Sequence, residues 1–248
     1  MRFFDVNCFI GLPTVAIQKP VKTAGELLER MDRAGIEKAL VWHVCQRDYA
    51  VAEGNRLLAE AIAPHKDCLT GCWAVLPNQW GELPPPQEFC EQMVKANVKA
   101  LRVFPGMHNF LLRQETLGPM LEVMVKRRIP LILPITGEVG WPAAFDLLRT
   151  YPKLRCILSN VNTCGTERQY APLLAGYSHV YLEMSEFILD GGIEAVTARF
   201  GAEKLLFGTG FPRRGHGGAM LALQHAAISA AEKAAIAAGN LETLLNWE

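Results

Sequence analysis

The sequence lacks any stretch approaching the roughly 18 uninterrupted apolar residues that a membrane-spanning helix needs. Its first residues, MRFFDVNCF, also lack the apolar run and the small-residue cleavage site of a secretory signal. The 25 basic residues balance the 25 acidic ones, so the formal net charge is zero. No overall field therefore favours nucleic acid or an anionic membrane. We expect a cytoplasmic protein whose partner is a small molecule.

A disulfide framework and a closely spaced metal motif are missing as well. The chain has seven cysteines, an odd number, and no Cys-x-x-Cys pair. In a chain without a secretory signal this pattern predicts free thiols, several of which pack as small apolar side chains in strands.

The sequence does contain a regular alternation of short apolar runs with longer segments of helical periodicity. With 248 residues and 50% hydrophobic content, the chain can bury a sizeable core. About eight such alternations favour a single (β/α)8 TIM barrel, one domain over residues 1–248, over an open sheet. The expected strands are Arg2–Val6, Lys38–Val44, Leu69–Val75, Ala100–Phe104, Leu131–Leu133, Arg155–Leu158, Val180–Glu183 and Lys204–Phe207.

Amphipathic stripes predict the helices between these strands. The expected helices are Thr23–Ala34, Val51–Ile62, Gln87–Ala96, Leu117–Lys126, Pro142–Thr150 and Ile193–Phe200. Extra C-terminal helices, about Ala219–Ser229, Ala231–Ala238 and Asn240–Leu245, are expected to close the barrel wall. Two long loops, Pro77–Pro86 and Pro105–Thr116, follow strands and are expected to shape a pocket at the C-terminal face.

Residues 205–212, LLFGTGFP, are similar to the last barrel strand of amidohydrolase-related proteins, where the usual sequence is Phe-Gly-Ser-Asp-x-Pro. The closing GNLETLL resembles the terminal helix motif of the same family. The resemblance covers essentially the whole chain. It implies a TIM barrel related to metal-dependent hydrolases and decarboxylases, and it makes oligomerisation through the alanine-rich C-terminal helices plausible. Packing of those helices on the barrel would explain their apolar stripes equally well.

The resemblance also implies where metal ligands should stand, and each of those positions is substituted. The His-x-His after the first strand falls on Asn7 and Phe9, and the histidines of strands five and six fall on Pro134 and Asn160. The aspartate of the last strand falls on Gly210. We therefore expect a branch of the family that works without the usual metal, and hence no cofactor. A displaced zinc site is the alternative; its candidate ligands are His43, Cys8, Cys45, His108, Cys164, Glu138 and Glu183.

Three titratable residues at or beyond strand ends are candidates for proton transfer: His43, Glu138 and Glu183. A histidine in this place either packs against a backbone carbonyl or carries protons near neutral pH. The two glutamates could act as an acid and base pair. Glu138 could instead sit at the start of a helix as a favourable N-terminal charge.

Substrate binding is assigned to polar side chains expected at the barrel mouth, which are Asn7, Arg47, Arg102, His108, Asn160, Thr209 and Arg213. Arg102 lies within a strand and needs an anionic partner, either Glu183 or a ligand. Arg47 could bind a carboxylate or pair with Asp48 or Glu53. Arg213 belongs to a glycine-rich basic turn that either holds an anion or is solvated.

The first functional hypothesis is a pocket that binds or converts a small anionic, carboxylate-bearing molecule. If catalysis occurs, we expect metal-free hydrolysis or decarboxylation, with His43 carrying the proton, Glu138 or Glu183 as its partner, and Arg47 or Arg102 orienting the anion. A metal-dependent hydrolase with a displaced site and a non-catalytic binding or assembly protein are the alternatives.

Overall fold

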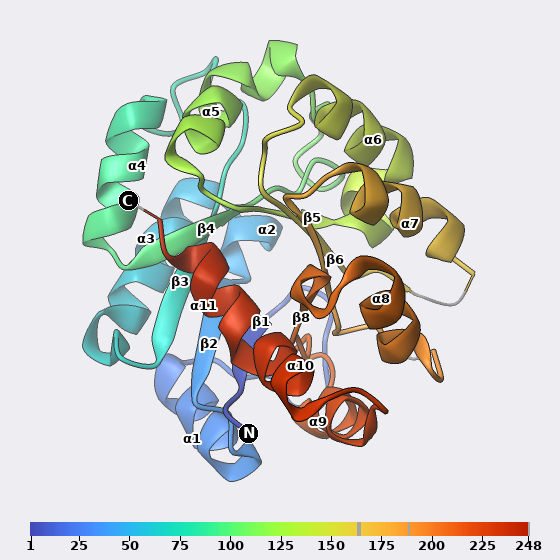
Figure 1. The fold of residues 1–248 in the computed structure, drawn as a ribbon. Coiled ribbons are helices and arrows are strands. Elements are labelled where there is room, and N and C mark those ends of the chain that lie inside the picture. Colours follow the sequence, from blue (N-terminus) through green and yellow to red (C-terminus); the bar gives the residue numbers. More distant parts are fainter. Residues whose placement is uncertain (163–164, 188, 248) are drawn as a thin grey trace.

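A single (β/α)8 TIM barrel forms the molecule in a computed structural model that describes residues 1–162, 165–187 and 189–247 (Figure 1). Eight parallel strands follow one another round the sheet in sequence order. They are β1 (Phe4–Ile10), β2 (Lys38–His43), β3 (Leu69–Ala74), β4 (Val98–Arg102), β5 (Leu131–Pro134), β6 (Cys156–Ser159), β7 (Val180–Glu183) and β8 (Leu205–Leu206).

Backbone contacts between the first strand and the chain at and after the last strand close the barrel. Val6 N donates to Phe207 O at 3.0 Å, and Phe9 N donates to Phe211 O at 2.9 Å. Cys8 and Phe211 form an isolated parallel bridge. These bonds continue the pairing beyond the two residues of β8, so the chain after β8 is tied to β1.

Helices surround the strands, as the periodicity predicts. The main ones are α1 (Ala24–Ala34), α3 (Val51–Ile62), α4 (Pro86–Lys95), α5 (Gln114–Arg127), α6 (Gly140–Thr150), α7 (Glu167–Gly176) and α8 (Gly192–Phe200). Thr23 caps α1 by accepting a hydrogen bond from Glu26 N at 3.2 Å, and Gly35 ends it with a left-handed φ of 74°. A short α2 (Cys45–Asp48) follows β2 and was not expected from the sequence.

The C-terminal segment begins with α9, which packs beside α8 in the barrel wall, and its later part crosses one end of the barrel (Figure 1). It comprises α9 (His216–His225), α10 (Ala230–Ala234), a π turn at Ala235–Gly239 and α11 (Asn240–Leu245). Asn240 Nδ2 donates to the carbonyls of Ala202 and Leu205, and Arg155 donates to Leu244 O, all near the starts of strands. The last part of the segment, with α11, therefore covers the N-terminal end, which leaves the opposite end for a site.

Among the strands, expected and observed boundaries differ most at β1, which runs to Ile10 and not to Val6. All of its residues are buried, polar Asp5 and Asn7 included. The sequence pattern also missed α7, because Pro172 inside it breaks the apolar stripe. None of the helices in the described part of the chain has the length and apolar content that crossing a bilayer requires.

Candidate functional site

A cavity of about 310 Å³ opens at the C-terminal ends of the strands. All five positions where the family resemblance places metal ligands line it, and they come from β1, the end of β5 and the loops after β6 and β8. These positions are Asn7, Phe9, Pro134, Asn160 and Gly210. The C-terminal face of a TIM barrel is where its sites are built. This cavity is therefore the candidate functional site.

Arg102, the last residue of β4, lies on the inner wall of the cavity and is only 2% exposed. Its Nη2 donates to Oδ1 of Asn7 at 2.9 Å, while its Nε is buried without a partner. No described carboxylate lies within ion-pair distance of this guanidinium, so the expected pairing with Glu183 is absent. Burial lowers the pKa of Arg102 from its ordinary value. The cavity thus contains a desolvated positive charge that has no direct ion pair with a described carboxylate and interacts with Glu183 only at a longer distance.

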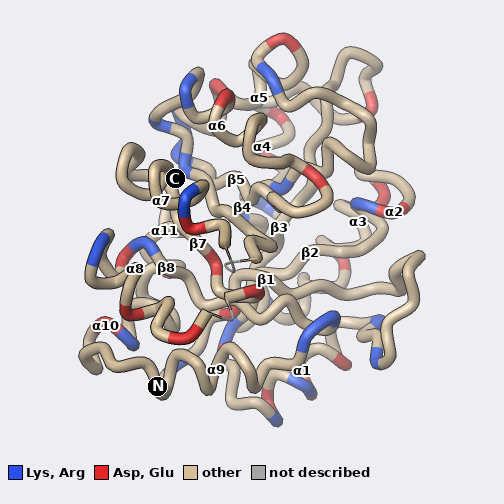
Figure 2. Tube along the Cα trace, turned by 90° about the vertical axis from the view of Figure 1, so that its right-hand side faces the viewer, with Lys and Arg blue, Asp and Glu red and all other residues tan. Residues whose placement is uncertain are grey.

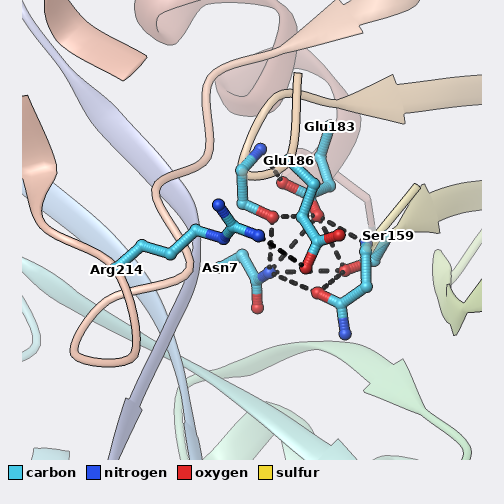
Figure 3. Close-up of polar contacts among 7 residues, drawn as sticks. Asn7, Ser159, Glu183, Glu186 and Arg214 are labelled. Atoms are coloured by element: carbon cyan, nitrogen blue, oxygen red, sulfur yellow. Dashed lines mark hydrogen bonds and ion pairs between the residues drawn. The ribbon is translucent and has the colours of Figure 1, made fainter. Parts of the chain in front are cut away.

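Glu183 lies behind the cavity wall and holds a polar network together (Figure 3). It is 1% exposed and does not itself line the cavity. Its Oε1 accepts from Ser159 Oγ and Asn160 N, each at 2.9 Å, and from Ser185 Oγ at 2.7 Å. Asn7 Nδ2 donates to the same oxygen at 3.3 Å. Asn7 therefore connects Glu183 on one side with Arg102 on the other.

Asn160 is held in this network in an unusual backbone conformation. Its φ of 52° lies in the left-handed region, which asparagine tolerates better than other side-chain-bearing residues. Its Oδ1 accepts from Asn7 Nδ2 at 3.3 Å. The amide is thereby fixed at the cavity wall.

Aromatic rings form the apolar side of the cavity. Trp42 lies 5.0 Å from the ring of Phe9 and 5.3 Å from that of Phe104, measured between ring centroids. The Cζ of Arg102 lies 5.0 Å from the Trp42 ring centroid, within the range of a cation–π contact. One cavity thus combines a flat apolar wall with a buried cation.

Arg47 and Glu138 meet at the cavity rim. Arg47 Nε donates to Glu138 Oε1 at 2.8 Å, and Arg47 Nη1 pairs with Asp48 Oδ1 at 2.8 Å. Met107 N donates to the other oxygen of Glu138 at 3.0 Å. Arg47 is therefore already paired with carboxylates, and Glu138 presents an oriented carboxylate to the cavity.

The loop after β8 supplies two more guanidinium groups. Arg214 pairs with Glu186, which follows β7, at 3.4 Å (Figure 3). Arg213 lines the cavity and has no ion pair with a described residue. Glu186 and Ser185 were not expected as site residues, although the segment MSE directly follows the predicted strand and could have indicated them.

Thr209 points away from this cavity, into a cluster around Asp5. Its N donates to Asp5 Oδ1 at 3.0 Å, its hydroxyl donates to Asp5 Oδ2, and His216 Nδ1 lies 3.3 Å from that hydroxyl. Burial would raise the pKa of Asp5, but hydrogen bonds from His216, Thr209, Asn7 and Cys8 bring it below its usual value. This cluster, which the sequence reasoning missed, anchors the chain after β8 to β1. Thr209 faces a neighbouring cavity of about 750 Å³.

The two candidate histidines lie outside the 310 Å³ cavity. His43 is half-buried beside Gly11, and its Nδ1 accepts from Cys45 N at 3.1 Å. His108 Nε2 contacts Arg47 O at 3.1 Å, and its ring packs edge-on against Phe104. Burial lowers the pKa of both imidazoles. Successive residues of a strand face opposite sides of the sheet. Trp42, which precedes His43 in β2, therefore lines the cavity, and His43 does not.

The residues at the positions that the family resemblance assigns to metal ligands do not fit a divalent metal ion. Phe9, Pro134 and Gly210 offer no side-chain ligand, and the Asn7 oxygen already accepts from a cation. Within the described residues, no group of three His, Cys, Asp or Glu side chains is arranged to hold a metal. Cys164, one of the candidate ligands of a displaced zinc site, lies outside the described residues.

Solved structures share this architecture over nearly their whole length. A TIM-barrel protein from Bordetella bronchiseptica matches with a TM-score of 0.74 and 17% identity, covering 99% of this chain and 98% of its own. The 5-carboxyvanillate decarboxylase of Sphingomonas paucimobilis matches with a TM-score of 0.74 and 13% identity, covering 100% and 99%. A dihydroxybenzoic acid decarboxylase from Polaromonas, solved with manganese and the inhibitor 2-nitroresorcinol, matches with a TM-score of 0.71 and 15% identity, covering 98% and 96%.

These identities establish a shared fold only. No curated protein matches the chain. The sequence profile of the amidohydrolase family matches residues 11–247, nearly the entire chain. The resemblance of LLFGTGFP is thus confirmed, and this protein belongs to the amidohydrolase family.

Proposed function

We propose that the cavity binds a small planar carboxylate and that Arg102 holds the carboxylate group. The observation that carries this proposal is the buried guanidinium of Arg102, which has an unpartnered Nε and no carboxylate partner. A buried charge is costly unless it is paired. A bound anion would supply the missing partner, and a guanidinium binds a carboxylate with two parallel hydrogen bonds.

The shape of the cavity supports an unsaturated or aromatic ligand. The rings of Phe9, Trp42 and Phe104 line one side, and a volume of about 310 Å³ suits a small molecule. The decarboxylases with this fold are named for aromatic acids, namely 5-carboxyvanillate and dihydroxybenzoate. A benzoate-type ligand matches both the aromatic wall and the cation.

Arg102 also takes over the charge that a metal would supply. The Polaromonas decarboxylase was solved with manganese, whereas here a guanidinium lines the cavity beside the positions that the family resemblance assigns to metal ligands. A fixed positive charge in a desolvated cavity stabilises an anionic ligand strongly, because the dielectric constant there is low. Arg213 adds a second cation at the rim.

Glu138 is the residue best placed for proton transfer. It lines the cavity, and its two oxygens are held by Arg47 and Met107 N, whereas His43 does not reach the cavity and Glu183 is occupied by its network. In a decarboxylation the bond to the carboxylate carbon breaks and CO₂ leaves. The electron pair left on the ring carbon takes a proton from a water molecule that the Glu138 carboxylate orients, and the hydroxide that remains combines with CO₂ to give bicarbonate. In a hydrolysis the same carboxylate would take a proton from water.

Calorimetric titration with benzoate and 2,6-dihydroxybenzoate tests the binding proposal. We expect Arg102→Met to weaken binding at least tenfold, about 1.4 kcal/mol. Arg149→Met, on the exposed surface of α6, is the matched control and should leave affinity unchanged. Equal affinity of wild type and Arg102→Met would refute the carboxylate site.

Release of CO₂ that Glu138→Gln abolishes while binding persists would establish catalysis. Binding without turnover would favour a non-catalytic binding protein.

A further inference from the structure

A second hollow adjoins the candidate site on the outer side of the loop after β8. It has a volume of about 520 Å³ and is lined by residues 16–19 of the loop after β1, by Arg30 of α1 and by residues 211–215. We call it the basic groove. Its charged lining residues are Lys19, Arg30, Arg213 and Arg214, and no carboxylate lines it.

Most of this positive charge is not compensated by the described residues. Only Arg214 has an ion pair, with Glu186 at 3.4 Å, and Glu186 lies on the side of the other cavity. Lys19, Arg30 and Arg213 form no ion pair with any described carboxylate. Figure 2 shows Lys and Arg positions, coloured blue, around α1. Clustered cations at a concave surface concentrate anions there.

The floor of the basic groove is rigidly positioned. Phe211 O accepts from Phe9 N at 2.9 Å, and Phe211 N donates to Thr209 Oγ1 at 3.2 Å. The ring of Phe211 stacks on His216 with centroids 4.0 Å apart. Arg214 N closes the turn by donating to Gly210 O at 3.2 Å. The backbone that carries Arg213 and Arg214 is thus fixed before any anion arrives, which reduces the entropy cost of binding.

We propose that the basic groove is a second anion site, selective for a phosphate-type dianion. Lys19, Arg30 and Arg213 supply three positive charges, whereas a single carboxylate carries only one negative charge. Guanidinium groups also bind the oxygens of phosphate with paired hydrogen bonds. The phosphate belongs either to a ligand that also occupies the 310 Å³ cavity, because Arg213 and Arg214 line both hollows, or to a separate phosphate ion. The site itself does not depend on the proposed carboxylate function.

Titration with inorganic phosphate and pyrophosphate at constant ionic strength tests this site. We expect Arg30→Gln and Lys19→Gln each to weaken phosphate binding at least fivefold without changing benzoate affinity. Arg33→Gln, also exposed on α1 but not lining the groove, should change phosphate affinity less than twofold. Melting temperatures of the variants control for folding.

Phosphate binding that is unchanged in Arg30→Gln and Lys19→Gln, or weakened equally in Arg33→Gln, would overturn the proposal. Arg102→Met separates it from the proposed function, because that variant should lose benzoate binding and retain phosphate binding. Phosphate binding that is independent of added benzoate would identify a separate ion. A compound with both groups that binds at least tenfold tighter than either ion would identify one bifunctional ligand. Both of these last results support the basic groove.

Discussion

The Nη2 of Arg102 donates to Oδ1 of Asn7 at 2.9 Å, and this amide is the side chain that stands between the guanidinium and the buried carboxylate of Glu183. The amide separates two opposite charges that would otherwise neutralise each other. The positive charge of Arg102 is therefore directed to the cavity, while Glu183 is satisfied by Ser159, Asn160 and Ser185. A buried charge without a direct carboxylate partner lowers the stability of the folded protein. A bound anion can offset that loss.

Arg102→Met should consequently raise stability while it removes ligand binding. Methionine fills a similar volume without a desolvated charge, and replacing buried ionic groups by apolar ones is often stabilising. We expect the free energy of unfolding in urea to rise by about 1 kcal/mol. Arg102→Lys retains the charge and serves as the control. A large loss of stability in Arg102→Met would show that the guanidinium is structural.

The barrel could be predicted from the sequence because its signals are local and repeated. Strand β7 was located at its exact bounds, and α3 likewise, since apolar runs and helical stripes depend on neighbouring residues only. The position of the cavity was also predictable, because Asn7, Asn160 and Gly210, which the family resemblance aligns with metal ligands, stand within or shortly after strands in recognisable sequence contexts.

Which side chains face the cavity was not predictable with the same accuracy. His43 and Trp42 are consecutive, and a shift of one residue in β2 decides which of them points inward. Glu183 is a plausible catalytic acid in the sequence, but its carboxylate accepts hydrogen bonds from residues far away along the chain, 176 positions for Asn7 and 24 for Ser159. Such long-range partners leave no local trace.

Gly208→Ala should destabilise the protein through the carboxylate of Glu183. An added Cβ would overlap Glu183 Oε2 and lie 3.1 Å from Val6 Cγ1, so the network must move. We expect a loss of about 3 kcal/mol, measured by urea unfolding. Gly218→Ala in α9 is the matched control, since its Cβ would meet nothing within 4 Å, and it should gain about 0.5 kcal/mol. A neutral Gly208→Ala would contradict the tight placement of the carboxylate.

His43 should affect the pH dependence of stability and not ligand binding. Burial lowers the pKa of this imidazole in the folded protein, so the fold favours its neutral form. Its contribution is full above the unfolded pKa of about 6.5 and is lost as the pH falls through the lower folded pKa. His43→Asn, which keeps an acceptor for Cys45 N, should therefore lose less stability than wild type between about pH 7.5 and about pH 5.5.

Urea unfolding at several pH values measures this difference, and benzoate titration at pH 8 checks the site. His108→Asn provides a comparison, because burial lowers the pKa of His108 as well. Loss of benzoate affinity in His43→Asn at unchanged stability would show that His43 contributes to ligand binding.

Divalent metals should not stabilise the wild-type protein. A metal at the former ligand positions would meet Phe9, Pro134 and Gly210, which provide no side-chain ligand, and would lie close to the guanidinium of Arg102. A site filled at 100 times its Kd would add about 2.7 kcal/mol, which thermal unfolding detects readily. We expect no shift of Tm with zinc or manganese, and less than stoichiometric metal by elemental analysis of untagged protein prepared without chelator. Near-stoichiometric metal that disappears in His43→Ala would instead establish a displaced metal site, and the proton chemistry assigned to Glu138 would then have to be replaced by that of a metal-bound water.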